Sequence, residues 1–147
     1  MAETKNQQLI FLAEDDQDNC VLFGDALRTV DAHCRLECCM DGVELMQKLH
    51  EARYLLPDVI FLDLNMPRKN GWESLREIKG APRLAAIPIV IFSTASGSRE
   101  MKKGYDAGAD LFIVKPDCFH MLIAIIRNVL AGLRSGLSTC TPVPSAT

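Results

Sequence analysis

The chain has 147 residues, a net charge of −3 and a sequence pI of about 5.6, with 48% hydrophobic and 24% charged residues. These values are typical of one soluble globular domain. The slightly acidic balance argues against a nucleic-acid partner, whose phosphates require clustered Lys and Arg. The apolar stretch over 118–133 is interrupted by polar residues, so we expect no membrane span. Residues 1–8 form a short polar segment without the apolar core of a signal peptide, which predicts a cytoplasmic protein.

Five short apolar runs rich in β-branched and aromatic residues predict five strands. Four of these runs are continuously apolar, which is typical of strands buried on both faces of a parallel sheet. The second run is more polar, as suits a strand at the edge of a sheet. The predicted strands cover 9–13, 34–40, 58–64, 87–92 and 111–114.

Segments with helical periodicity follow the strands. The first segment places four apolar residues on one predicted buried face: Val21, Leu22, Ala26 and Leu27. Strict alternation of strand and helix predicts right-handed βαβ units. We therefore expect residues 9–134 to form an α/β domain, a doubly wound five-stranded parallel sheet flanked by five helices. Residues 135–147, rich in Ser, Thr and Pro, are predicted to be a flexible tail.

The last helical segment, 118–134, is apolar over more than one stripe. It is either a broad core face or a second apolar surface that docks a partner or a twin subunit. Two other segments begin with a cap residue followed three positions later by Glu, namely Asp41 with Glu44 and Asn70 with Glu73. We expect Asp41 to be a helix cap and not a ligand.

Polar residues follow the predicted strands where these end. They are three consecutive acids over 14–16, then Asp63, Ser93 and Lys115. In a doubly wound sheet, ligands bind outside the carboxyl ends of the strands, so these side chains should share one edge. Acids packed together repel unless a cation neutralises them, and Mg²⁺ prefers oxygen ligands. A carboxylate can also be the nucleophile in phosphoryl transfer, with lysine and a hydroxyl for the phosphoryl oxygens.

Four motifs occur together in one order: 12–16 (LAEDD), 58–67 (DVIFLDLNMP) followed by Gly71, 88–93 (PIVIFS) and 114–116 (VKP). In this order they resemble the receiver domain of two-component response regulators over 9–134, nearly the whole chain. The resemblance implies the flavodoxin-like receiver fold with strand order 2-1-3-4-5. The run over 63–72 also resembles single-domain regulators that are paired with phytochrome-type or hybrid sensor kinases.

The same resemblance assigns roles to residues. It makes Asp63 the phosphoacceptor and also a metal ligand, with Glu14 and Asp15 as the acidic pair that holds Mg²⁺. The position of Asn65 gives its main-chain carbonyl to the metal, and Lys115 fits the family's lysine.

Three further assignments concern the response to phosphorylation. Ser93 fits the switch hydroxyl, and Phe112 lies where the family has a rotating Tyr or Phe. The family's Lys-Pro peptide bond is cis, which implies a cis bond between Lys115 and Pro116.

The resemblance also implies partners. A sensor histidine kinase or a phosphotransfer protein would donate the phosphoryl group, and the chain would catalyse only its own phosphorylation and dephosphorylation. The absence of room for an output domain after Arg134 predicts a stand-alone regulator that signals through a downstream protein. Two copies of the chain could form a homodimer through their fourth and fifth helices.

Alternatives remain open at this point. Spacing alone does not decide which two of the three acids over 14–16 face the site, although the family register makes Asp16 a helix cap. Either Ser93 or its neighbour Thr94 could present the hydroxyl. A phosphorylation-independent pseudo-receiver and a flavodoxin-like cofactor binder use related folds, but the latter needs a phosphate loop where this chain has acids.

Overall fold

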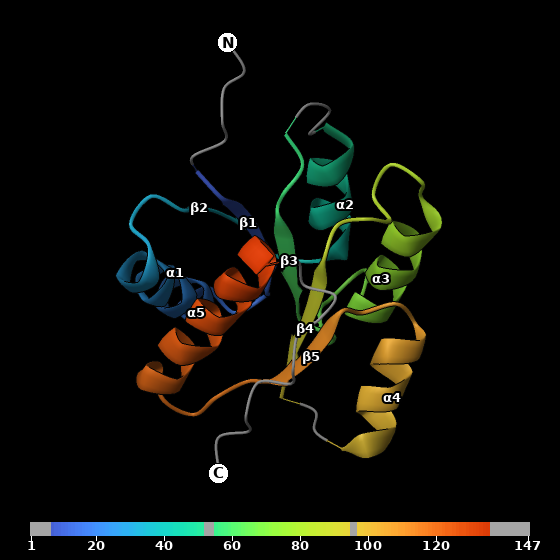
Figure 1. Ribbon diagram of the computed structural model, residues 1–147. Helices are drawn as coiled ribbons and strands as arrows, with labels where there is room; N and C mark the ends of the chain where they lie inside the picture. The colour runs from blue at the N-terminus through green and yellow to red at the C-terminus, as the bar shows by residue number, and fades with distance from the viewer. Residues whose placement is uncertain (1–6, 52–54, 95–96, 136–147) are drawn as a thin grey trace.

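The computed structural model describes residues 7–51, 55–94 and 97–135. Five parallel strands form one sheet in the order β2-β1-β3-β4-β5, which confirms the predicted fold and strand order (Figure 1). The strands are β1 (Leu9–Ala13), β2 (Arg35–Cys39), β3 (Val59–Leu62), β4 (Ile89–Ser93) and β5 (Leu111–Val114).

Five helices cover the two faces of the sheet. They are α1 (Gln17–Val30), α2 (Gly42–Glu51), α3 (Gly71–Gly80), α4 (Ser98–Asp106) and α5 (Phe119–Ser135). Helices α1 and α5 lie side by side on one face, whereas α2, α3 and α4 lie on the other (Figure 1). Among the described residues, no helix is both long enough and apolar enough to cross a membrane.

Burial of the strands follows their place in the sheet. All residues of β1, β3 and β4 are buried, whereas most residues of the edge strand β2 are partly exposed. This difference confirms the prediction that the more polar second run is an edge strand, because only inner strands of a doubly wound sheet are covered on both sides.

Three phenylalanines join α1 to the centre of the sheet. The rings of Phe23 in α1, Phe61 in β3 and Phe92 in β4 meet edge to face, with centroids 4.9 to 6.1 Å apart. This arrangement is the one that aromatic quadrupoles favour. Because Phe92 directly precedes Ser93, this cluster also fixes the end of β4 that carries the hydroxyl.

The prediction for the buried face of α1 is partly wrong. Ala26 and Leu27 are buried, but Val21 is 61% exposed and Leu22 is 47% exposed. Cys20 and Phe23 take the core positions instead. In a helix each residue turns about 100°, so residues one and two positions past Cys20 leave the face that contacts the sheet.

The described residues contain no cis peptide bond, so the expected cis bond between Lys115 and Pro116 is wrong. A peptide bond before proline prefers the trans form by about 0.5–1 kcal/mol, and the loop after β5 keeps that form.

Helix α5 serves mainly as a core element. Five of its apolar residues are buried in the core cluster shared with α1, namely Leu122, Ile125, Ile126, Val129 and Leu130. The broad-core interpretation therefore accounts for most of its apolar surface. The flexible tail was predicted over 135–147, but Ser135 is still the last residue of α5, and residues 136–147 lie outside the described residues.

Candidate functional site

The carboxyl edge of the sheet brings the predicted site residues together. Three of them directly follow a strand, and hydrogen bonds that continue the sheet hold their backbones: Glu14 N donates to Cys39 O (2.9 Å), Asp63 N to Ala13 O (3.0 Å) and Lys115 N to Ser93 O (2.9 Å). The side chains of Glu14, Asp63 and Lys115 are therefore fixed by β1, β3 and β5, whose carboxyl ends meet at this edge.

Three acids form a cluster here. One carboxylate oxygen each from Glu14, Asp15 and Asp63 lies within 4.8 Å of the others. Glu14 and Asp63 are buried, whereas Asp15 is exposed. A set of carboxylate oxygens, two of them on buried side chains, fits a hard divalent cation such as Mg²⁺, so these residues could hold the metal that the fold family implies.

Lys115 reaches across the sheet edge to both buried acids. Its Nζ atom donates to Glu14 Oε1 at 2.6 Å and to Asp63 Oδ2 at 3.1 Å. Burial raises the pKa of Glu14, and Lys115 offsets part of that effect. Burial would lower the pKa of Lys115, but the hydrogen bond with Glu14 and the charge of Asp63 outweigh it, so this pKa is raised. The lysine thus stays charged and balances the acids.

The carboxylate of Asp63 is held from two sides. The backbone N–H of Asn65 donates to Asp63 Oδ1 at 3.1 Å, while Lys115 occupies Oδ2. Asn65 therefore belongs to the site through its main chain, although its predicted role as a carbonyl ligand of a metal stays a prediction.

The structure distinguishes two neighbours at the end of β4. Ser93 is fully buried as the last residue of the strand, whereas Thr94 is exposed. Ser93 pairs in register with Val114, directly before Lys115. This placement favours Ser93 as the switch hydroxyl, as the family register implied.

The acid Asp16 has a different task from its two neighbours. Its side chain caps α1 and accepts hydrogen bonds from the backbone N–H groups of Asp18 (2.8 Å) and Asn19 (3.3 Å). The predicted cap is confirmed, and the cluster of acids holds Glu14 and Asp15 from this run. A capping carboxylate satisfies helix donors that have no partner within the helix.

Phe112 is buried in β5 and is tied to α4. Its backbone N–H donates to the hydroxyl of Tyr105 at 3.1 Å. No signal in the sequence indicated this contact between a helix side chain and a strand backbone.

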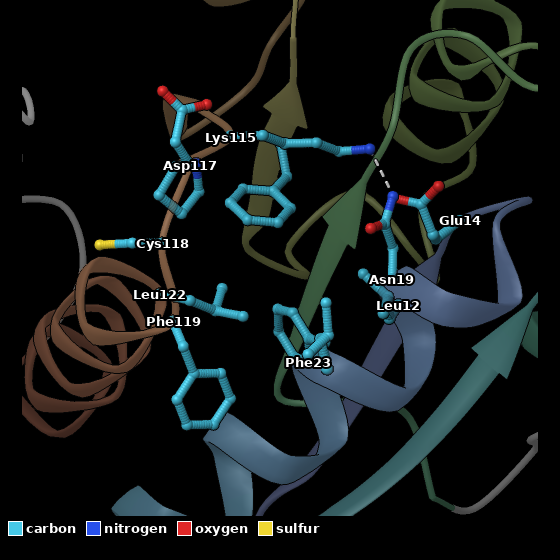
Figure 2. Close-up of a pocket in the computed structure, with 12 residues that line it drawn as sticks. Leu12, Glu14, Asn19, Phe23, Lys115, Asp117, Cys118, Phe119 and Leu122 are labelled. Atoms are coloured by element: carbon cyan, nitrogen blue, oxygen red, sulfur yellow. Dashed lines mark hydrogen bonds and ion pairs between the residues drawn. The ribbon is translucent and has the colours of Figure 1, made fainter.

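A cavity of about 160 Å³ beside the acids was not predicted. Apolar residues of α1, β4 and the start of α5 line most of it, with Glu14 and Lys115 at one end (Figure 2). Phe23 and Leu122 point toward it, and Phe119 lies at the far end (Figure 2). The exposed Leu22, misplaced by periodicity, also lines this cavity.

Comparisons with known proteins agree with this arrangement. The chain matches the crystal structure of the phosphorylated cyanobacterial phytochrome response regulator RcpA with 33% sequence identity and a TM-score of 0.79, over 92% of this chain and 97% of RcpA. Response regulator Rcp1 of Synechocystis sp. is 28% identical over 131 residues, which cover 86% of this chain and 89% of Rcp1. The structure of the Mn²⁺-bound form of Rcp1 matches with a TM-score of 0.73 and 27% identity, over 94% of this chain and 99% of Rcp1.

Some relatives are much longer than the matched region. The gliding motility regulatory protein of Myxococcus xanthus is 35% identical over 80 residues, which cover 54% of this chain and 10% of that protein. The family described as "response regulator receiver domain" matches residues 10–127, which are most of the chain. The chain belongs to the response regulator receiver domain family of two-component signalling.

Proposed function

We propose that the chain is a single-domain response regulator that accepts a phosphoryl group on Asp63 in a Mg²⁺-dependent reaction. The observation that carries this proposal is the position of Lys115, which bridges the buried carboxylates of Glu14 and Asp63 beside the exposed acid Asp15. A sensor histidine kinase or a phosphotransfer protein would be the donor, and the reaction would take place in the cytoplasm.

The chemistry follows from the residues at the sheet edge. A carboxylate oxygen of Asp63 would attack the phosphorus of a phosphohistidine; the P–N bond breaks, and the nitrogen keeps the electron pair. Glu14, Asp15 and Asp63 would hold Mg²⁺, which when bound neutralises charge on the phosphoryl oxygens. Lys115 already lies 3.1 Å from Asp63 Oδ2 and would donate to a phosphoryl oxygen there. The chain would catalyse only its own phosphorylation and its later hydrolysis.

The donor would approach along the exposed apolar rim beside this edge. Val21 and Leu22 on α1 and Phe119 at the start of α5 are all partly or largely exposed. Leu22 and Phe119 also border the cavity that ends at Glu14 and Lys115 (Figure 2). An apolar side chain of the donor could enter this cavity while its phosphohistidine faces Asp63.

The output would be a change of surface read by another protein. Phosphorylation replaces the single negative charge of the Asp63 carboxylate with a phosphoryl group that carries about two negative charges and new acceptor oxygens. The buried Ser93 and the charged Lys115 could follow these oxygens, and Phe112 would carry the change toward α4 and α5. A downstream protein, or a second copy of the chain through α4 and α5, would then bind.

Mass spectrometry of the intact protein tests the proposal. After incubation with Mg²⁺ and acetyl phosphate, we expect a mass increase of one phosphoryl group that disappears in Asp63→Asn and persists in the exposed control variant Asp106→Asn. No added group would support the pseudo-receiver alternative, and a group that survives Asp63→Asn would overturn Asp63 as the phosphoacceptor. A flavodoxin-like cofactor binder is disfavoured by the acids after β1, where such a protein needs a phosphate-binding loop.

A further inference from the structure

Arg68 has a backbone conformation that L residues rarely adopt. It has a φ of 63°, and no other non-glycine residue in the described part of the chain has a positive φ. Such a conformation persists only where the surroundings impose it, and it recurs near functional sites. Arg68 lies in the loop over 63–70, between β3 and α3, five residues after Asp63 and three after Asn65.

The partner of Arg68 is a fixed, buried acid in a neighbouring loop. Arg68 Nε donates to Asp41 Oδ2 at 2.6 Å. Asp41 is only 5% exposed, and its Oδ1 atom accepts from the backbone N–H of Glu44 at 2.9 Å, as predicted for the cap of α2. The exposed arginine therefore connects the 63–70 loop to a carboxylate that α2 already holds.

The two loops also meet through their backbones. Gly42 N donates to Lys69 O at 3.0 Å. A Cβ atom at Gly42 would lie 2.4 Å from Lys69 O and 2.4 Å from Ser74 Oγ, closer than any side chain tolerates. The position next to Asp41 therefore requires glycine, so that the loop of Arg68 can approach. An ion pair and a close backbone contact thus join the same two segments.

We infer that Asp41 and Arg68 are a positioning pair for the phosphoacceptor site. In the part of the chain that the structure describes, no hydrogen bond or ion pair joins either side chain to the acids at the sheet edge. They act through the loop, because the ion pair holds Arg68 in its left-handed conformation and so sets the path of the chain that leaves Asp63 and Asn65. The inference rests on the proposed function, since it names residues that shape the same site.

Calorimetric titration with MgCl₂ tests the pair. In Arg68→Ala the guanidinium is lost while the unfavourable φ remains. We therefore expect Mg²⁺ affinity to fall by about tenfold, as is typical for residues that orient metal ligands without binding the metal themselves. Arg68→Lys should keep most of the affinity, because a cation remains near Asp41. Asp41→Asn should lower Mg²⁺ affinity as much as Arg68→Ala does. The double variant should show no further loss of affinity, since both changes remove the same interaction.

Two controls separate positioning from general stability. Ile126→Ala creates a cavity in the core on the opposite face of the sheet, so it should lower stability and leave Mg²⁺ affinity unchanged. Arg28→Ala removes an exposed ion pair with Asp25 on α1 and should change neither the stability nor the Mg²⁺ affinity. Wild-type affinity in Arg68→Ala would overturn the inference alone. A wild-type chain that binds no Mg²⁺ and takes no phosphoryl group would overturn the proposed function as well.

Discussion

The ammonium group of Lys115 lies 2.6 Å from a carboxylate oxygen of Glu14, closer than the 3.1 Å that separates it from Asp63. Both acids are buried, so the lysine compensates two charges that the protein interior would otherwise disfavour. Its contact with Glu14 leaves Asp63 the less tightly paired acid. Under the proposed function, a lysine placed in this way would turn toward a phosphoryl group on Asp63 without leaving the site.

Replacement of Lys115 by Met should destabilise the fold. Two buried carboxylates would lose their counter-charge, and breaking a buried ion pair from one side costs about 3 kcal/mol of unfolding free energy. Urea unfolding measures this loss, and Glu14→Gln in the same chain should restore part of it. The exposed control variant Lys102→Met, which loses only a surface ion pair with Asp106, should unfold like the wild type. Equal stability of Lys115→Met and the wild type would contradict the assigned charge balance.

Mg²⁺ should stabilise the folded chain through the three acids. A ligand that binds only the folded state adds about 2.7 kcal/mol at a hundredfold excess over its Kd. Asp15→Ala should remove most of this gain, although it leaves the fold intact because it relieves repulsion between acids. Thermal unfolding with and without MgCl₂ measures both effects, with NaCl at matched ionic strength as the control. An unchanged Mg²⁺ response in Asp15→Ala would show that Asp15 is not a ligand.

The sequence predicts the sheet and the site well because both depend on local patterns. The strands β1 and β5 begin and end as their apolar runs predict, and the residue after each strand gives Glu14 and Lys115. The orientation of α1 was harder to predict, because Val21 and Leu22 are as apolar as the residues that the core accepts.

Contacts between distant loops leave no periodic signal. Asp41 and Arg68 are 27 residues apart, and their ion pair depends on a backbone conformation that the sequence around Arg68 does not indicate. The hydrogen bond from Phe112 to Tyr105 joins a strand backbone to a helix side chain in the same way. Such features follow from tertiary packing, which decides how the predicted elements face one another.

Removal of the Tyr105 hydroxyl should weaken the attachment of α4 to β5. In Tyr105→Phe the backbone N–H of Phe112 would lose its acceptor, and an unsatisfied donor costs about 1–2 kcal/mol where water cannot replace the partner. Urea unfolding measures the loss, and amide hydrogen exchange at Phe112 should accelerate. Exchange at Phe61, in the central strand β3, serves as the internal control. Unchanged exchange at Phe112 would mean that the contact does not hold in solution.

The ion pair of Asp41 predicts a specific dependence of stability on pH. The hydrogen bond from Arg68 holds the pKa of Asp41 below its ordinary value of 3.8. The folded state therefore binds this proton more weakly than the unfolded chain, so Asp41 adds stability that is complete above pH 3.8 and is lost as the pH falls through the folded pKa.

Asp41→Asn isolates this contribution, because its amide oxygen can still cap α2 while the charge is gone. At pH 7 the wild type should have the larger free energy of unfolding, and the difference should shrink as the pH falls below 3.8, where the protonated acid resembles the amide. Urea unfolding of both chains between neutral and acidic pH measures this difference. A constant difference across the series would mean that the charge of Asp41 does not stabilise the loop of Arg68.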